Sequence, residues 1–360
     1  MIKVAVKAKS HSYDIFLGEG CVGLLAEELK RLNPSSVLIV TNATVGPLYL
    51  QEVSRICAEA ASVSSVILPD GEKYKDWQSV SLILENLAAS GADRKSVVIA
   101  LGGGVVGDLA GFAAAIYMRG IRFIQVPTTL LALVDSSVGG KTGMNMRAGK
   151  NLVGAFHQPE AVIADTAFLK TLPKREVAAG IGEIIKHGVL ADKAYFERLE
   201  RDIEKLSALD HQTVAEVVAR SCEIKADVVS RDETEKGERA KLNLGHTFCH
   251  AIEKLCGFGA WLHGEAVGAG LVLAAQTSVA LGKMSEADAL RVEKLVQCAH
   301  LPVRIPGLSA QAAIDAMKGD KKSTKGVPKF ILPEGIGSAV IQEVPEEVIR
   351  EVLLKEGYEP

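Results

Sequence analysis

The chain has 360 residues, 48% of them hydrophobic, which is enough apolar material for two cores. Its 41 lysines and arginines nearly balance its 44 acidic residues, so the net charge is only −3. This balance excludes a general attraction to nucleic acid or to an anionic membrane. An anionic ligand must therefore be held by a local cluster of cations.

Three further features predict a cytoplasmic protein that does not span a membrane. The N-terminal stretch "MIKVAVKAKSHSYDI" alternates apolar and polar residues and lacks the apolar centre of a signal peptide. No apolar run approaches the roughly 18 residues that cross a bilayer. The cysteines form no C-x-x-C pair, which favours a reducing compartment; they are Cys21, Cys57, Cys222, Cys249, Cys256 and Cys298.

The first half of the chain alternates short apolar runs with helical patterns. The runs are β-branched, bounded by turn residues, and separated by helix-length segments such as 45–60 and 75–90. Strands that are apolar on both faces are typical of a parallel sheet covered by helices on each side. The expected strands are "VLIVT" (37–41), "SVILP" (65–69), "VVIAL" (97–101), "RFIQVP" (122–127) and "AVIAD" (161–165).

Beyond "LKTLPKREVAAG" the spacing of apolar residues becomes helical. We expect a small hairpin within 329–341 and a last helix over 345–356. A domain boundary at Leu172–Pro173 gives an α/β domain of residues 1–172 and a mainly helical domain of residues 173–360. The expected helices before the hairpin are 174–190, 193–206, 210–230, 239–256, 264–282 and 285–299.

A glycine turn follows one of the predicted strands in "VVIALGGGVVGDLAGF" (97–112). Gly102, Gly104 and Gly107 satisfy G-x-G-x-x-G, but the turn is not on the first strand and no acid follows at the usual distance. Glycines at the start of a helix favour an anion such as phosphate, because the backbone amides are accessible there. The alternative is a tight turn between strand and helix that binds nothing.

The segment "DSSVGGKTGMNMRAGKN" (135–151) also suggests an anion site. It is not a P-loop, because the leading glycine of that motif would fall on Asp135. Lys141 and Lys150 nevertheless lie in a glycine- and hydroxyl-rich segment, and Arg119 adds a third cation nearby in the sequence. The alternative is an exposed, solvated loop.

The helical half contains candidate metal ligands. Catalytic zinc is usually held by three protein ligands, and the spacing of His246 and His250 places both on one face of a helix. H-E-x-x-H does not apply, because residue 247 is Thr. The two histidines could be two ligands, one ligand and one acid–base group, or buried structural side chains; the other candidates are Glu183, His187, His263 and, more remotely, Cys249.

Several motifs, taken together and in order, closely resemble those of 3-dehydroquinate synthases. They are "DGEKYK" (70–75), "GGGVVGD" (102–108), "VPTTLLALVDSSVGGKTGMN" (126–145), "GEIIKHG" (182–188), "LNLGHTFCHAIE" (242–253) and "LHGEAV" (262–267). The resemblance implies an N-terminal NAD-binding α/β domain and a C-terminal helical metal-binding domain, similar in fold to glycerol dehydrogenases.

The resemblance also implies an activity. The substrate would be 3-deoxy-D-arabino-heptulosonate 7-phosphate, a sugar acid phosphate, and the products 3-dehydroquinate and phosphate, in the shikimate pathway. The implied steps are transient NAD-dependent oxidation at C5, elimination of phosphate, reduction, ring opening and an intramolecular aldol closure. NAD and one divalent ion, zinc or cobalt, are the implied cofactors, and a homodimer is the implied assembly.

The resemblance assigns site residues one by one. The implied metal ligands are Glu183, His246 and His263. The implied NAD residues are Asp70, Gly71, Glu72, Lys73, Tyr74, Lys75, Gly104, Val105, Val106, Gly107, Asp108, Thr128, Thr129, Asp135, Lys141, Lys150, Phe168, Leu169, Lys170 and Thr171. The implied substrate residues are Arg119, Lys141, Asn151, Lys186, Lys225, Arg239, Asn243, His250 and Lys321 or Lys322. By this mapping His246 is a ligand, and His250 faces the substrate.

Three other functions are compatible with parts of the sequence. A related cyclase, such as a 2-deoxy-scyllo-inosose synthase, would share NAD, metal and phosphate elimination but would have no substrate carboxylate to bind. A polyol dehydrogenase of the same fold would need no cluster for phosphate and carboxylate. A non-catalytic ligand-binding protein would need neither a complete metal set nor the basic cluster.

Overall fold

The computed structural model describes residues 1–360 except 258–259, 306 and 319–328. These residues form two compact units, each described by itself below. The first unit comprises residues 1–172 and 214–234, and the second comprises 173–213 and 235–360. The division into domains 1–172 and 173–360 stays a prediction; the compact units differ from it in residues 214–234.

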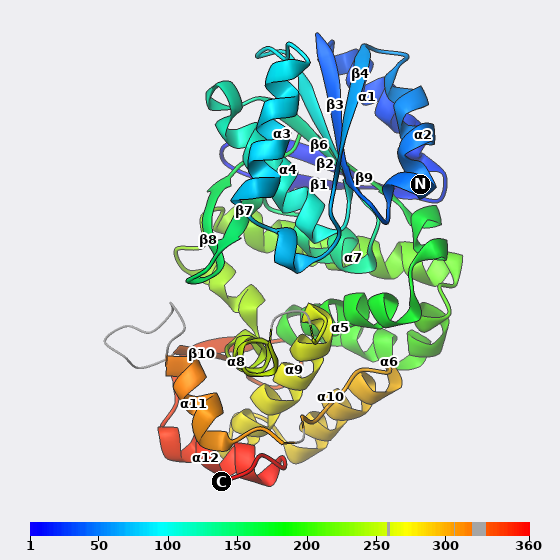
Figure 1. Ribbon diagram of the computed structural model, residues 1–360. Coiled ribbons are helices and arrows are strands. Elements are labelled where there is room, and N and C mark those ends of the chain that lie inside the picture. The colour runs from blue at the N-terminus through cyan, green and yellow to red at the C-terminus, as the bar shows by residue number, and fades with distance from the viewer. Residues whose placement is uncertain (258–259, 306, 319–328) are drawn as a thin grey trace. The chain divides into compact units, whose positions relative to one another are not determined.

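The first unit is built on a seven-stranded sheet with the order β1-β2-β9-β6-β5-β3-β4 (Figure 1). Only β1 and β2 pair antiparallel; all other neighbours are parallel, as predicted. The strands are β1 (Ile2–Lys7), β2 (Ser12–Gly18), β3 (Ser36–Asn42), β4 (Ser62–Leu68), β5 (Val97–Gly102), β6 (Arg122–Pro127) and β9 (Ala161–Asp165).

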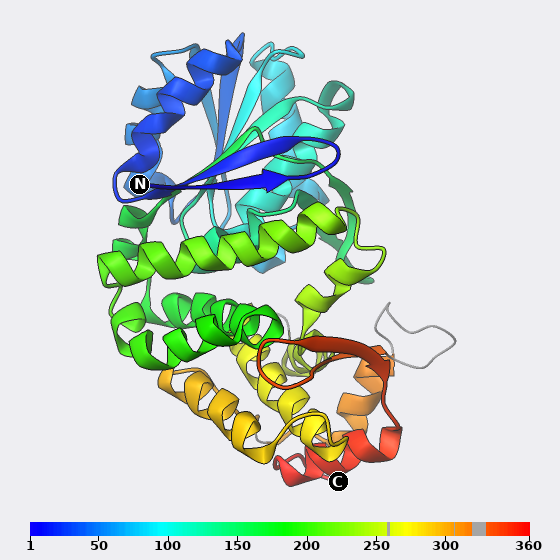
Figure 2. The same cartoon turned by 180° about the vertical axis from the view of Figure 1, so that it is seen from behind.

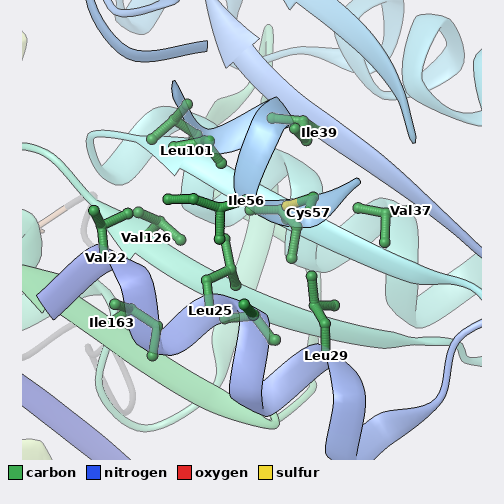
Figure 3. Packing of buried hydrophobic residues seen from close by; sticks show 14 of the residues in the cluster. Val22, Leu25, Leu29, Val37, Ile39, Ile56, Cys57, Leu101, Val126 and Ile163 are labelled. Carbon is green, nitrogen blue, oxygen red and sulfur yellow. The ribbon is translucent and has the colours of Figure 1, made fainter. Parts of the chain in front are cut away.

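Helices cover both faces of this sheet, which explains why its strands are apolar throughout. Successive side chains of a strand point to opposite faces, so Ile39 packs with α1 (Leu24–Leu32) and α2 (Gly46–Cys57) in the core shown in Figure 3. The next residue, Val40, packs on the other face with α3 (Trp77–Ala89) and α4 (Gly104–Ile116). The predicted α/β class is therefore confirmed.

Two parts of the first unit differ from the prediction. For residues 135–151 the sequence suggested an anion site or an exposed loop and no strands. They follow on from a π-helical turn, η4 (Ala132–Ser136), into an antiparallel hairpin of β7 (Lys141–Met146) and β8 (Gly149–Phe156). The hairpin was not predicted because glycine is uncommon in strands. Gly143 and Gly154 lie opposite each other here, and a Cβ on either would clash with the backbone of the other strand. Helix α7 (His211–Arg231), expected among the helical half, contributes residues 214–231 to this unit.

Figure 2 shows the hairpin of β1 and β2 in blue and the long helix α7 in green, seen from behind. Glu233, just beyond α7, binds the turn of this hairpin. Its carboxylate accepts hydrogen bonds from the Ser10 backbone N–H (3.0 Å) and from Gln158 Nε2 (2.9 Å), and the side chain is only 8% exposed. Burial opposes ionisation, but the hydrogen bonds from Ser10 and Gln158 outweigh it and lower the pKa of Glu233. Glu233 is therefore a buried, hydrogen-bonded carboxylate and not a solvated surface charge.

We expect Glu233→Gln to lower the free energy of unfolding by about 2 kcal/mol at neutral pH, since hydrogen bonds to a charged group are lost. Because the pKa of Glu233 is lower in the folded protein, this stabilisation is fully present above the pKa of the unfolded chain, about 4.3. It disappears as the pH falls through the pKa of the folded protein. Urea unfolding of both proteins across this range measures it. Glu223→Gln, an exposed position on α7 paired only at the surface with Arg220, is the control; an equal loss there contradicts the prediction.

The second unit is mainly helical, as predicted. Its described elements are α5 (Lys174–Ala191), α6 (Lys193–Ser207), η6 (Glu238–Asn243), α8 (His246–Cys256), α9 (His263–Ala280), α10 (Glu286–Cys298), α11 (Ala310–Lys318), β10 (Lys329–Pro333), β11 (Ala339–Glu343) and α12 (Glu346–Lys355). The helix expected over 239–256 is interrupted because Gly245 adopts a left-handed conformation (φ 75°). Within the described part of the chain, every helix is too short or too polar to cross a membrane.

Candidate functional site

Three predicted metal ligands come together in the second unit. Glu183 lies in the middle of α5, whereas His246 and His263 are the first residues of α8 and α9. One donor atom from each lies within 4.8 Å of the others. Glu183 Oε1 is 3.7 Å from His246 Nε2 and 3.3 Å from His263 Nε2. Both imidazoles therefore direct Nε2 toward the same carboxylate.

Glycines allow the three helices to approach this closely. Gly182 precedes Glu183, and a Cβ there would lie 2.6 Å from the backbone oxygen of Gly264, the residue after His263. A Cβ on Gly264 would lie 1.8 Å from the backbone oxygen of Ala179 on α5. Gly245, before His246, contacts the backbone of α9 in the same way. Each ligand thus adjoins a glycine at a helix contact, and backbone packing sets the ligand positions.

The donor set fits a divalent metal ion. Two imidazoles and one carboxylate are a common set for catalytic zinc, which leaves a coordination position for substrate or water. Glu183 is fully buried, and an ionised carboxylate at such a position requires positive partners. Lys186, one turn along α5, provides one of them by pairing with Glu183.

The protonation of the two imidazoles differs. Burial, together with the nearby Lys186 ammonium, holds the pKa of His246 well below its usual value, so this ring is neutral as a metal ligand must be. Burial also opposes protonation of His263, but interactions with Cys249, Glu183 and Glu253 outweigh it and raise that pKa. A metal ion at this site would displace the proton from His263.

Among the other predicted residues of this unit, His250 lies beside the metal-ligand group, and Arg239 and Asn243 lie shortly before His246 in the sequence. His250 lies one turn beyond His246, and the two rings meet edge to face with centroids 5.6 Å apart. Arg239 and Asn243 belong to η6, and Arg239 is only 1% exposed. Asn243 Nδ2 donates to Glu235 Oε1 at 2.6 Å. Lys321 and Lys322 lie outside the described residues.

Two residues beside His263 were not assigned a function from the sequence. Glu253 Oε1 is 3.4 Å and Cys249 Sγ 3.9 Å from His263 Nδ1. Cys249 had been considered only as a remote ligand candidate. Glu253 could have been found from its spacing, because it lies seven residues after His246 and so on the same face of α8.

In the first unit, the predicted NAD segments follow the carboxyl ends of parallel strands. Residues 70–75 follow β4, residues 104–108 follow β5, 128–129 follow β6, and 168–171 follow β9. The order of the sheet reverses at β3, which has β4 on one side and β5 on the other. Nucleotides bind beyond the carboxyl ends at such a reversal, so the topology brings these segments to one edge.

The glycine turn forms the centre of this edge. The strand β5 ends at Gly102, and α4 begins at Gly104 with its free amides pointing outward from the first turn. Cβ atoms on Gly102 and Gly107 would clash with Val106 and Gln125, so these two glycines also serve packing within the protein. The buried Thr128 Oγ1 has no hydrogen-bond partner among the described residues, and a bound nucleotide could supply one.

Lys75 links three of the predicted segments. Its ammonium contacts Asp108 Oδ2 at 2.5 Å and Asn151 Oδ1 at 2.7 Å. Asn145, which the sequence did not single out, donates from its backbone to Lys75 O and from Nδ2 to Glu72 Oε1. Asn145 Oδ1 also accepts from the backbone of Asn151, which has a left-handed conformation (φ 52°). These hydrogen bonds join the β7–β8 hairpin to residues 72–75.

Asp108 and Asp135 are acids with cationic partners. Burial raises the pKa of Asp108, and Lys75 opposes this. Asp135, in η4, accepts from Lys225 Nζ at Oδ1 (2.5 Å) and at its backbone oxygen (2.6 Å). Lys225 is a buried residue of α7, so the substrate lysine and the nicotinamide acid implied by the resemblance form one ion pair.

The remaining NAD residues contribute in different ways. Asp70 accepts hydrogen bonds from Asn42, the last residue of β3, and from Thr44, both at 2.7 Å, so these two residues hold its carboxylate in place. Lys73 lies over the ring of Tyr74. Thr129 Oγ1 accepts from the Ala132 backbone. In helix α4, Val105 is partly buried and Val106 is buried in the core, while Lys141 is exposed and Lys150 partly buried on the hairpin.

Residues 168–171 belong to the 3-10 helix η5 (Thr166–Thr171), in which the first two of these side chains are buried and the last two are exposed. Phe168 packs on Tyr49, Leu169 is buried, and Lys170 pairs with Glu19. Thr171 Oγ1 is 2.5 Å from the Tyr49 hydroxyl. The side chains of Phe168 and Leu169 therefore serve the protein core, whereas those of Lys170 and Thr171 are exposed to solvent.

Arg119 is not brought to this edge of the sheet. It follows α4 and precedes β6, so it lies at the amino ends of the strands. The 13 residues of α4 separate it from Gly104 by about 20 Å at 1.5 Å per residue. Within the first unit, Arg119 is therefore remote from the glycine turn.

Two family models match consecutive parts of the chain. The model of the 3-dehydroquinate synthase N-terminal domain matches residues 65–179, and that of the C-terminal domain matches residues 180–323. All the predicted metal, NAD and substrate positions fall within these two matches.

Solved structures agree. A 2-deoxy-scyllo-inosose synthase, complexed with carbaglucose-6-phosphate, NAD⁺ and Co²⁺, is 26% identical with a TM-score of 0.91, covering 99% of this chain and 100% of that one. The 2-epi-5-epi-valiolone synthase ValA from Streptomyces hygroscopicus subsp. jinggangensis 5008, with NAD⁺ and Zn²⁺ bound, is 29% identical with a TM-score of 0.89, covering 96% and 97%.

A more distant likeness concerns the fold alone. A probable glycerol dehydrogenase from Sinorhizobium meliloti 1021 is 15% identical with a TM-score of 0.65, and 95% of each chain is covered. The fold class expected from the sequence is thus confirmed by both near and distant structures. Given the two consecutive family matches and the cyclase structures, the chain belongs to the 3-dehydroquinate synthase family of sugar phosphate cyclases.

Proposed function

We propose that the protein is a 3-dehydroquinate synthase, which converts 3-deoxy-D-arabino-heptulosonate 7-phosphate to 3-dehydroquinate and phosphate. Both family matches carry the description of this synthase. The observation that carries the choice among cyclases is the buried Arg239, in the same unit as the metal-ligand group. A guanidinium binds a carboxylate with two parallel hydrogen bonds, and this substrate has a carboxylate in addition to its phosphate.

The cofactors are NAD and one divalent ion, zinc or cobalt. When bound, NAD⁺ would supply a reversible hydride acceptor, and the ion would supply a Lewis acid for the substrate's oxygens. Glu183, His246 and His263 would hold the ion. The first turn of α4 would hold the NAD diphosphate through its backbone amides, and Thr128 would offer its buried hydroxyl.

The protein's own groups bind and orient the substrate. The proposed substrate residues are Lys186, Arg239, Asn243 and His250 of the second unit, with Lys141, Asn151 and Lys225 of the first. Arg119, which lies at the amino ends of the strands, is left out of this set. The adjacent Lys321 and Lys322 add a further cation. Together they offset about three negative charges of the substrate at neutral pH, which a protein of net charge −3 can do only through local cations.

The elimination step needs no dedicated side-chain base. Once C5 is a ketone, the proton on C6 is acidic, and the substrate's own phosphate can accept it as the C7–O bond breaks. The electron pair of the C6–H bond forms the C6–C7 double bond, and phosphate leaves with the proton. After C5 is reduced again, ring opening and intramolecular aldol closure follow, so NAD is regenerated in each turnover. Holding one substrate throughout makes these steps unimolecular.

Incubation with the heptulosonate phosphate, NAD⁺ and Zn²⁺ tests this proposal. We expect phosphate and 3-dehydroquinate in equal amounts, with no net change in nicotinamide absorbance at steady state. Phosphate release from glucose 6-phosphate, but not from the heptulosonate phosphate, would identify a 2-deoxy-scyllo-inosose synthase instead. Net accumulation of NADH would identify a dehydrogenase. A homodimer in the cytoplasm, acting in the shikimate pathway, is part of the same proposal.

A further inference from the structure

The two nitrogens of His263 face two different carboxylates. Nε2 lies 3.3 Å from Glu183 Oε1, in the metal-ligand group, and Nδ1 lies 3.4 Å from Glu253 Oε1. Glu253 is only 4% exposed, on the face of α8 that also carries His246. An ionised carboxylate accepts hydrogen bonds but cannot donate them. In the neutral ring, contact with Glu253 therefore places the proton on Nδ1 and leaves the Nε2 lone pair directed at the ligand group.

His263 needs such a partner more than His246 does. The side chain of His246 is 10% exposed, and its Nδ1 donates to the Leu244 backbone oxygen at 3.1 Å, which fixes the ring from within its own chain segment. His263, the first residue of α9, keeps 34% of its side chain exposed. Without a fixed acceptor at Nδ1, its ring could rotate or change tautomer and withdraw Nε2.

We infer that Glu253 is a positioning residue, which orients His263 and increases its basicity as a metal ligand. The inference rests on the proposed metal-binding function. A carboxylate behind a ligating histidine is a recurrent outer-shell partner, and its loss typically costs 10–100-fold in metal affinity. Cys249 is the other group beside Nδ1, at 3.9 Å. Its thiol is a weak hydrogen-bond partner, and burial raises its pKa.

Zinc affinity without substrate tests the inference directly. The full-length protein is stripped with a chelator and titrated with Zn²⁺ against a competing indicator at neutral pH. Glu253→Gln keeps the size of the side chain but removes its charge, and we expect about tenfold weaker binding, with up to about 100-fold for Glu253→Ala. The visible absorption of the Co²⁺-loaded proteins should also change, because it reports the arrangement of the ligands.

Cys249→Ala is the matched control, since it alters the other neighbour of the same nitrogen. We expect its zinc affinity to stay within about threefold of the parent protein, below the usual range of outer-shell effects. Thermal unfolding of the stripped proteins should show no greater loss for Glu253→Gln than for Cys249→Ala, which separates ligand positioning from general stability. Unchanged zinc affinity in Glu253→Gln, or an equal loss in Cys249→Ala, would overturn the inference. A parent protein that binds neither Zn²⁺ nor Co²⁺ would instead refute the proposed metal function itself.

Discussion

His246→Ala should yield a folded protein that retains no stoichiometric zinc and has no detectable cyclase activity. His246 offers Nε2 to the ligand group and is 8% exposed, so its loss removes one of the three ligands from a buried position. We expect the zinc affinity to fall more than about 100-fold, beyond the range of outer-shell changes. Metal analysis after gel filtration measures this, together with phosphate release from the heptulosonate phosphate.

The neighbouring histidine provides the control for this result. His250→Ala removes an imidazole of the same size from the same helix face, one turn away, yet outside the group formed by Glu183, His246 and His263. We expect it to keep its zinc and to slow turnover by about 10²–10⁴-fold, the usual range for a proton-handling group. If His250→Ala lost the metal while His246→Ala kept it, the two roles would be reversed.

Gly264→Ala should destabilise the second unit and weaken its metal-ligand group at the same time. The new Cβ would lie 1.8 Å from the backbone oxygen of Ala179, and backbone cannot move aside as the end of a side chain can. Relief of the clash must separate α9 from α5, and therefore His263 from Glu183. We expect a loss of about 3 kcal/mol or more in the free energy of unfolding, at the upper end of overpacking effects, measured by urea unfolding with zinc retention on the same sample.

Gly268→Ala, one turn further along α9, is the matched control. Its Cβ would lie 3.2 Å from Val296 Cγ1 and 3.3 Å from Leu301 Cβ, side-chain atoms that can shift by a few tenths of an ångström. Alanine adds helix propensity at both positions, by up to about 1 kcal/mol in a helix interior, so a large loss of stability in Gly264→Ala alone reports the clash. Equal stability and equal zinc retention in the two variants would show that the contact between α5 and α9 does not hold the ligands in place.

Local pattern determined much of the fold. The run "VLIVT" predicted a doubly covered strand because Ile39 and Val40 both had to be buried, on opposite faces of the sheet. The switch to helical spacing after Pro173 predicted the helical unit. In contrast, the hairpin within residues 141–156 was not predicted from the sequence. Its glycines are needed because the backbone of the paired strand lies too close for a Cβ, and the local sequence does not show that contact.

The candidate site was likewise predicted in part from the sequence and in part only from the tertiary structure. The sequence by itself supplied the donors, because few residue types bind a divalent ion or a phosphate and the motifs placed them in order. It could not decide between His246 and His250, whose helical spacing is equally good for either role; the resemblance made that choice. Only the tertiary structure brought Glu183 to His246 and His263, and Glu253 behind His263, because close approach depends on glycine contacts between helices far apart in the chain. Periodicity reports which face of a helix is buried, whereas the partner across that face is decided by packing.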